Sequence, residues 1–297
     1  MPPDYTPSPP NLPRQLLLQK FYAMLDEDIG FGDVTTTALI SRNQEAKARL
    51  FTRQPGVVAG IDVTTTILED LGFSVIQKMQ DGSQVEANTT LLEAQGRAVL
   101  LLSIERTLLN LLQRMSGIAT ATANLVQKAR KINPKVRIAA TRKTAPLLRL
   151  FDKLSVIIGG GDPHRWRLDD AVLIKDNHLA FFSNPSQAIQ QARENVSFTC
   201  PIEIEVTTPQ AAKRAAKAGA NIILFDNMEP KEIAAVVEVI RQTHPSVILE
   251  ASGNITPNNI EHYANTGVDV ISVGWLTHSV QALDLSIDII PIPTEEE

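Results

Sequence analysis

The sequence is poor in cysteine and aromatic residues and has no long hydrophobic run. Its single cysteine, Cys200, cannot form an intrachain disulfide, and a cysteine-poor chain fits a reducing compartment such as the cytoplasm. The longest apolar run, Ala98 to Leu102, is far shorter than the roughly 20 residues of a membrane-spanning helix. The first residues also lack the basic and apolar regions of a secretory signal. We therefore expect a cytoplasmic protein with no membrane partner.

An excess of positive charge is absent as well. The 28 lysine and arginine residues are outnumbered by 33 aspartate and glutamate residues, which gives a net charge of −5. Domains that bind nucleic acid are usually basic, so this balance argues against a nucleic-acid partner. What the chain does have is 297 residues, 43% of them hydrophobic, which is enough for a barrel and a smaller domain.

Both ends of the chain are expected to be tails. Residues 1–13 contain six prolines, which predicts a disordered segment, and the acidic end at 291–297 is expected to fray. Residues 14–116 combine helical apolar spacing with short β-rich runs and turns, which predicts a small domain of helices and strands. Within the long helical pattern at 104–130, Ser116 and Gly117 predict a bend or a break.

After Pro134, short runs of valine, isoleucine and leucine alternate with helical segments. Near-continuous runs of this kind are typical of strands that are buried on both faces. Their alternation with helices predicts a parallel sheet with right-handed crossovers. Seven such strands favour a barrel, although periodicity alone also allows an open sheet. The runs are at 136–140, 156–158, 171–174, 202–206, 222–225, 247–249 and 270–273.

Charged or small polar residues follow almost every predicted strand where it ends. The first three ends are cationic, the next two are acidic, and the last two are small and rich in backbone groups. In chain order they are Thr141-Arg142-Lys143, His164-Arg165, Lys175, Glu205 after Glu203, Asp226, Ser252-Gly253-Asn254 and Ser272-Val273-Gly274. Barrel enzymes build their active sites on the face where the strands end.

The residue types at these ends predict a polyanionic ligand. Arginine forks and lysines suit carboxylates or phosphates. Two carboxylates suit Mg²⁺ that bridges to substrate phosphates, or sugar hydroxyls. Glycine- and serine-rich turns suit a terminal phosphate. Together these groups predict a phosphorylated sugar and a second anionic substrate.

Nine motifs in order resemble those of the quinolinate phosphoribosyltransferase family, and the resemblance runs from about Leu16 to about Val280. They are EDIGFGDVTT at 27–36, ERTLLNLLQRMSGIAT at 105–120, TRKT at 141–144, GGGDPHR at 159–165, LIKDNH at 173–178, IEIEVTT at 202–208, ILFDNM at 223–228, LEASGNI at 249–255 and VDVISVG at 268–274.

The resemblance implies the two-domain fold of a type II phosphoribosyltransferase. An N-terminal α/β domain of residues 14–116, joined by a C-terminal return at 279–297, would accompany an incomplete seven-stranded α/β barrel at 117–278. The implied reaction, that of a pentosyltransferase, joins quinolinate to phosphoribosyl pyrophosphate (PRPP) and releases CO₂ and pyrophosphate. The product is nicotinate mononucleotide, in de novo NAD biosynthesis. Mg²⁺ accompanies PRPP, and no organic cofactor is implied.

The resemblance also implies a role for each strand-end residue. Arg142, Lys143, His164 and Arg165 would hold quinolinate, helped by Arg106 from a partner subunit in a homodimer or hexamer. Lys143 and Lys175 would face PRPP, and Glu205 and Asp226 would bind its ribose hydroxyls and Mg²⁺. These last four residues form the implied catalytic set. The remaining substrate-binding residues would be Thr141 and, around the phosphate, Ser252, Gly253, Asn254, Ser272, Val273 and Gly274.

Two positions depart from the family pattern, and several roles stay open. Arg167 stands where glycine is common, and would either add a cation near the site or face solvent. Asn88 also replaces a common glycine and should tolerate a left-handed backbone. Glu203, Glu250 and His178 are either structural or part of the site.

Three other functions stay open. Lys175 could form a Schiff base, as in barrel aldolases. The chain could instead be a related phosphoribosyltransferase that acts on another acid such as nicotinate. It could also be a non-catalytic anion sensor.

Overall fold

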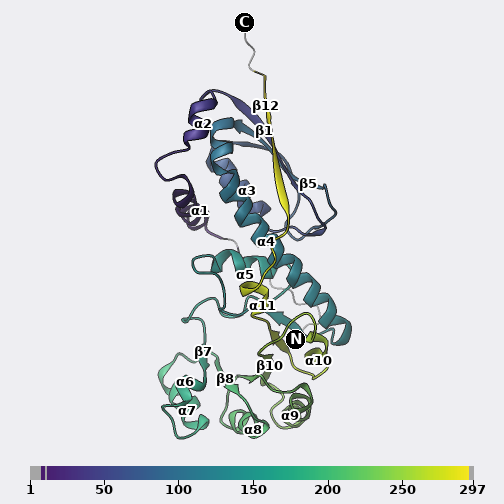
Figure 1. Cartoon of the computed structure of the whole chain (residues 1–297). Coiled ribbons are helices and arrows are strands. Elements are labelled where there is room, and N and C mark those ends of the chain that lie inside the picture. The colour runs from purple at the N-terminus through teal and green to yellow at the C-terminus, as the bar shows by residue number, and fades with distance from the viewer. Residues whose placement is uncertain (1–7, 11, 294–297) are drawn as a thin grey trace. The chain divides into compact units, whose positions relative to one another are not determined.

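The computed structural model describes residues 8–10 and 12–293; the other parts of the two expected tails, at 1–7, 11 and 294–297, lie outside the described residues. The described chain forms two compact units (Figure 1). The first unit is Ser8–Ala121 with residues 280–293, and the second unit is Thr122–Ser279. None of the helices in the described part is long and apolar enough to cross a membrane.

The first unit is built on an antiparallel sheet with the strand order β12-β1-β5-β3. Its central strand β1 (Glu45–Thr52) alternates buried and more exposed side chains, as expected for a sheet covered on one face. Helix α3 packs on β3 and β5, and α1 packs on α3. The other elements are α1 (Arg14–Ile29), α2 (Val34–Leu39), β2 (Gly56–Val57), α3 (Ile61–Asp70), β3 (Ser74–Lys78), β4 (Gln84–Val85), β5 (Thr90–Arg97) and β12 (Leu285–Pro291).

The last strand of the chain, β12, completes this sheet. It pairs with β1 from Ala46↔Pro291 to Thr52↔Leu285, so segments more than 200 residues apart in the sequence lie side by side. Asn88, two residues before β5, adopts a left-handed φ of 65°, which confirms that asparagine tolerates this position.

Helix α4 (Ala98–Ile132) is continuous for 35 residues, so the predicted bend or break at Ser116 and Gly117 is wrong. Both residues are instead required by close contacts. A Cβ atom on Gly117 would lie 2.2 Å from the carbonyl oxygen of Gln281, and the buried Ser116 hydroxyl accepts a 3.1 Å hydrogen bond from the Ala59 N–H. The glycine therefore allows the chain before β12 to approach the helix.

The second unit contains a parallel sheet with the strand order β6-β11-β10-β9-β8-β7. Helices α7, α8 and α9 pack against its strands or one another on the outer side (Figure 1). The strands are β6 (Arg137–Ala139), β7 (Val172–Ile174), β8 (Ile202–Val206), β9 (Ile222–Asp226), β10 (Ile248–Ser252) and β11 (Val270–Ser272). The helices are α5 (Arg149–Ile158), α6 (Asp176–Leu179), α7 (Pro185–Asn195), α8 (Pro209–Lys217), α9 (Pro230–Thr243), α10 (Ile260–Ala264) and α11 (Trp275–His278).

The prediction of a strand at 156–158 is wrong, because these residues form the last turn of α5. A short apolar run reads the same in a buried helix as in a buried strand. Here Phe151, Leu154 and Ile157 repeat at helical spacing and are all buried. At the place of the expected strand, a single parallel bridge joins Ala139 to Asp162. The described residues therefore form six of the seven expected strands.

We predict that Gly117→Ala destabilises the protein, although alanine favours a helix by about 1 kcal/mol over glycine. The new methyl group must displace the backbone at Gln281, and such overpacking costs about 1–3 kcal/mol. Urea unfolding should therefore show a net loss of stability. Asn110→Ala, at an exposed position of the same helix, is the control and should not destabilise; equal stability of the two variants would contradict the prediction.

Candidate active site

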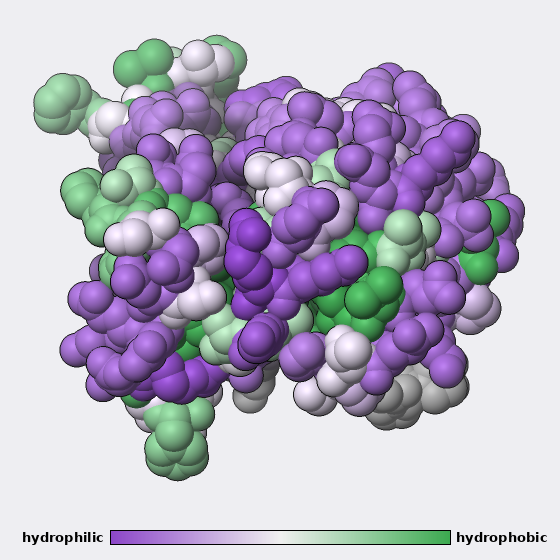
Figure 2. Space-filling view, turned by 90° about the horizontal axis from the view of Figure 1, so that it is seen from below, coloured by the Kyte–Doolittle hydropathy of each residue, from purple (hydrophilic) through white to green (hydrophobic). Residues whose placement is uncertain are grey.

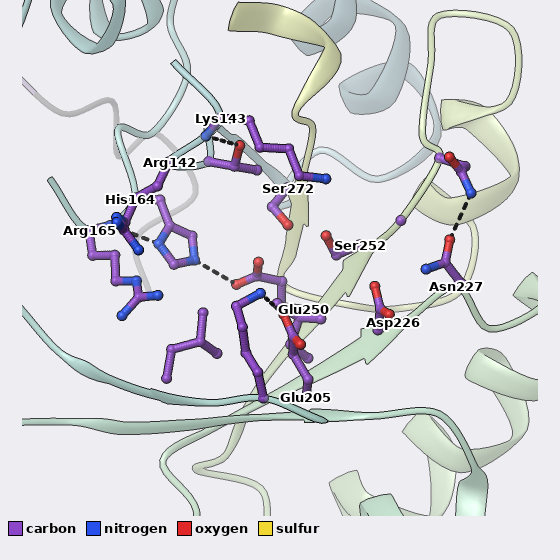
Figure 3. Close-up of a pocket in the computed structure, with 16 residues that line it drawn as sticks. Arg142, Lys143, His164, Arg165, Glu205, Asp226, Asn227, Glu250, Ser252 and Ser272 are labelled. Atoms are coloured by element: carbon purple, nitrogen blue, oxygen red, sulfur yellow. Dashed lines mark hydrogen bonds and ion pairs between the residues drawn. The ribbon is translucent and has the colours of Figure 1, made fainter. Parts of the chain in front are cut away.

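A cavity of about 400 Å³ opens where the parallel strands of the second unit end (Figure 3). All strands of a parallel sheet present their carboxyl ends on the same edge, so residues distant in sequence converge there. The cavity is lined by Thr141, Arg142, Lys143, His164, Arg165, Leu173, Lys175, Glu205, Leu224, Asp226, Asn227, Glu250, Ser252, Gly253, Asn254 and Ser272.

Three residues of the predicted site do not line this cavity. Val273 is fully buried, and its N–H donates a 2.8 Å hydrogen bond to the Ala139 carbonyl. Gly274 lies directly beside the cavity, since a Cβ on it would be 3.0 Å from Cδ of Lys143. Arg106 belongs to the other unit, where it lines a separate hollow with Arg53 and other residues.

One wall of the cavity carries the guanidinium groups of Arg142 and Arg165 (Figure 3). Nε of Arg142 is buried and has no acceptor among the described residues. Burial and the nearby charge of Arg142 lower the pKa of Arg165. The loop before them is fixed by a 3.0 Å hydrogen bond from the Lys143 N–H to the Thr141 hydroxyl. The buried Nε of Arg142 has no acceptor among the described residues, and the charges of Arg142 and Arg165 repel each other. A bound anion would relieve both effects.

His164 stands on two buried carboxylates at the base of this wall. Its Nε2 lies 3.4 Å from Glu250 and 3.7 Å from Glu203. Burial alone would lower the pKa of His164, but the charge of Glu250 and hydrogen bonds to both carboxylates raise it to about 10. Burial also raises the pKa of Glu203, and the neighbouring Glu250 adds to this effect.

His164, Glu203 and Glu250 lie close enough to one another to surround an ion. The main-chain N–H of Arg165 donates a 2.7 Å hydrogen bond to Nδ1 of His164, and Nε2 of the same ring faces the two carboxylates. The Arg165 N–H and the two glutamates therefore fix the orientation of the His164 ring.

The opposite side of the cavity is acidic (Figure 3). Glu205 and Asp226 lie on neighbouring strands, and Glu205 pairs in register with Leu224, so both carboxylates share the face that lines the cavity. Glu205 forms an ion pair with Lys175. The ion pair directs the Lys175 side chain toward the acidic side of the cavity.

A tight turn after β10 forms the third side. Gly253 has a φ of 98°, and a Cβ there would lie 2.4 Å from Oδ1 of Asn227, so only glycine fits. Asn254 donates a 2.9 Å hydrogen bond to the same oxygen. At the end of the neighbouring strand β11, the buried Ser272 hydroxyl has no partner among the described residues. Such turns and free hydroxyls are suited to phosphate oxygens.

Sequence reasoning missed Asn227 as a lining residue, although its position directly after Asp226 at a strand end was a usable signal. The apolar residues Leu173 and Leu224 gave no such signal. His178, left open, accepts a 3.0 Å hydrogen bond from the Lys175 N–H and so has a structural role in the turn into α6. Arg167 is 72% exposed and pairs with Asp169, so its side chain faces solvent.

Comparisons with known proteins agree with this geometry. Residues 33–116 match the model of the quinolinate phosphoribosyl transferase N-terminal domain, and residues 118–288 match that of the C-terminal domain. A probable nicotinate-nucleotide pyrophosphorylase (carboxylating) of Methanothermobacter thermautotrophicus is 47% identical over 90% of this chain and 96% of its own length. The human nicotinate-nucleotide pyrophosphorylase (carboxylating) is 37% identical over 86% of this chain and 88% of its own.

Solved structures agree as well. The crystal structure of NadC from Streptococcus pyogenes superimposes with a TM-score of 0.88 at 36% identity, covering 96% of this chain and all of that one. The N-terminal antiparallel sheet and the C-terminal parallel α/β unit are those of a type II phosphoribosyltransferase. The chain belongs to the quinolinate phosphoribosyltransferase family.

Proposed function

We propose that this chain is a quinolinate phosphoribosyltransferase that makes nicotinate mononucleotide from quinolinate and PRPP, with release of CO₂ and pyrophosphate. The observation that carries this proposal is the division of one cavity into three parts. One wall is cationic with an unpaired donor, the second is acidic, and the third is a turn shaped for phosphate.

The cationic wall suits quinolinate, which carries two adjacent carboxylates. Arg142 and Arg165 can each present a planar fork to one carboxylate, and a dianion relieves the repulsion between them. Lys143 and His164 complete this side. A monoacid such as nicotinate would leave one of the guanidinium groups without a partner.

The other two sides suit PRPP. Ser252, Gly253, Asn254 and Ser272 would bind its 5′-phosphate, while Lys175 and Lys143 would face the pyrophosphate. Glu205 and Asp226 would bind the ribose hydroxyls and Mg²⁺. Mg²⁺ commonly takes one or two protein carboxylates and keeps several waters, so this pair fits a hydrated ion.

The reaction needs no protein nucleophile. Pyrophosphate leaves the anomeric carbon, and the carboxylates of Glu205 and Asp226 stabilise the positive charge that develops there. The lysines stabilise the departing oxygens, and bound Mg²⁺ would neutralise further negative charge on pyrophosphate. The quinolinate nitrogen forms the new bond to this carbon. Its pyridinium ring then accepts the electron pair released when the neighbouring carboxylate leaves as CO₂, and a proton takes its place.

Arg106 belongs to the unit that does not contain this cavity. From the family resemblance, we propose that a partner subunit supplies it to this cavity in a homodimer or hexamer. Large exposed apolar side chains occur in both units, including Phe31, Val34, Leu147 and Phe181. Hydrophobic groups stand out on the otherwise hydrophilic face in Figure 2. A cytoplasmic location stays a prediction from composition.

Substrate choice tests the proposed function directly. Purified protein supplied with PRPP, Mg²⁺ and quinolinate should release pyrophosphate and CO₂ in equal amounts, and should not turn over nicotinate. Turnover of nicotinate alone would show a related transferase instead. Binding of PRPP without any pyrophosphate release would show an anion sensor.

Removal of Arg142 should weaken quinolinate use strongly. Each charge-assisted hydrogen bond is worth ~1.5–3 kcal/mol, so Arg142→Ala should lower kcat/KM for quinolinate on the order of 10- to 100-fold or more. Arg167→Ala removes an exposed arginine of a nearby loop and should leave kcat/KM unchanged. Equal kinetics of the two variants would remove Arg142 from the site.

Mixed dimers test whether the site is shared. Arg106→Ala and Lys175→Ala subunits, each inactive alone, should regain activity when mixed, because one site in each mixed dimer has both residues. Random pairing should restore roughly a quarter of wild-type activity in a symmetric dimer. Arg142→Ala mixed with Lys175→Ala is the control. Both residues belong to the cavity of the same subunit, so no mixed dimer contains an intact site. No recovery in the first mixture would place Arg106 outside the shared site.

A further inference from the structure

Helix α5 connects the two loops that carry the cations of the cavity, although the helix itself does not line the cavity. One loop is residues 141–148, and the other is residues 162–166. Arg149, in the first turn of the helix, donates to the hydroxyl of Thr144 in one loop at 3.2 Å. It also donates to the carbonyl of Trp166 in the other loop at 3.4 Å.

Two fully buried charged residues of α5 make the same pair of connections. Asp152 and Lys153 are both 0% exposed. The Asp152 carboxylate accepts a 3.2 Å hydrogen bond from the Ala145 N–H, three residues after Arg142. The Lys153 ammonium donates to the carbonyl of Pro163, the residue directly before His164.

The two loops need such support because their backbones are unfavourable. Leu147 has a φ of 64° and His164 a φ of 52°, in the left-handed region that side-chain-bearing residues seldom adopt. Two adjacent arginines on these loops also repel each other. Local geometry and electrostatics thus both work against the arrangement, so it depends on contacts from a rigid element.

We propose that Asp152 and Lys153 are positioning residues that together set the spacing between Arg142 and Arg165, and that this spacing selects a dicarboxylate. This inference rests on the proposed function, because it takes quinolinate as the ligand of the two arginines. It adds a pair of residues that neither touches substrate nor lines the cavity.

A lysine is a costly choice for this place. Burial, with the charges of Arg149 and Arg142, lowers the pKa of Lys153 to about 8, and Asp162 and Asp170 only partly offset this. An apolar side chain of similar size would avoid the desolvation. The lysine is therefore better explained by its contact with the loop and its charge behind the anion-binding wall than by stability.

Lys153→Met tests the proposal, because methionine keeps the volume and removes both the donor and the charge. We expect kcat/KM for quinolinate to fall at least 10-fold while KM for PRPP changes less than about twofold, since all proposed PRPP contacts except Lys143 lie on other strands. Thermal unfolding should show a folded variant. The control is Ser155→Ala, on the same helix and also fully buried, whose hydroxyl bonds only within the helix to Phe151. It should leave both values unchanged.

Asp152 provides an independent pair of variants. Asp152→Ala removes the acceptor for the Ala145 N–H and should produce the same selective loss. Asp152→Asn keeps a carbonyl oxygen there and should recover much of the quinolinate affinity. If Lys153→Met does not fold, the comparison of Asp152→Ala with Asp152→Asn tests the positioning role instead.

The pH dependence of binding separates positioning from a purely structural role. A dianion in the cavity favours the ammonium form of Lys153, so its pKa rises on binding. Quinolinate affinity should therefore be full below pH 8 and decline as the pH rises through about 8, and Lys153→Met should lack this decline.

Four outcomes decide between the two proposals. Equal losses for quinolinate and PRPP in Lys153→Met would overturn the positioning role of Asp152 and Lys153, as would wild-type kinetics in both Lys153→Met and Asp152→Ala. An unchanged decline near pH 8 in Lys153→Met would overturn its electrostatic part. Failure of the wild type to use quinolinate would instead overturn the proposed function itself.

Discussion

The site depends on holding several positive charges together on one wall of a small cavity against their mutual repulsion. Arg142 and Arg165 face the same space, and burial together with the charge of Arg142 lowers the pKa of Arg165. Beneath them, the carboxylates of Glu203 and Glu250 stabilise His164 and supply compensating negative charge. Nε of Arg142 is buried without an acceptor among the described residues. In the proposed function, a dianionic substrate would supply that acceptor and complete the charge balance.

The parallel sheet explains why the sequence alone predicts most of this site. A run of Val, Ile and Leu marks each buried strand, and the residue after the run must lie on the shared carboxyl edge. This argument alone brings Lys175 and Asp226 together, while Glu205 lies near the end of its own run, and the structure places all three around one cavity. The division into cationic, acidic and phosphate-shaped sides could be predicted before any contact was known. The family resemblance added the substrates to this division.

The parts that were not predicted depend on tertiary contacts. The run at 156–158 was assigned to a strand because three apolar residues do not distinguish a strand from a buried helix. Gly117 was interpreted as a helix breaker because the approach of Gln281, more than 160 residues away, leaves no local signal. Lys153 lies in an apolar helical run and gives no hint of the loop that it holds. Arg106 remains known only through resemblance, since its proposed partner is another chain.

The pairing of β12 with β1 has a consequence for the order of folding during synthesis. Strand β1 leaves the ribosome more than 200 residues before one of its two partners, β12. Until then β1 is an edge strand with free backbone groups, which is a known hazard for association between chains. The parallel unit lies between the two strands in the sequence and is synthesised before β12 exists. The unit that starts earlier in the sequence is therefore the one whose sheet is completed later.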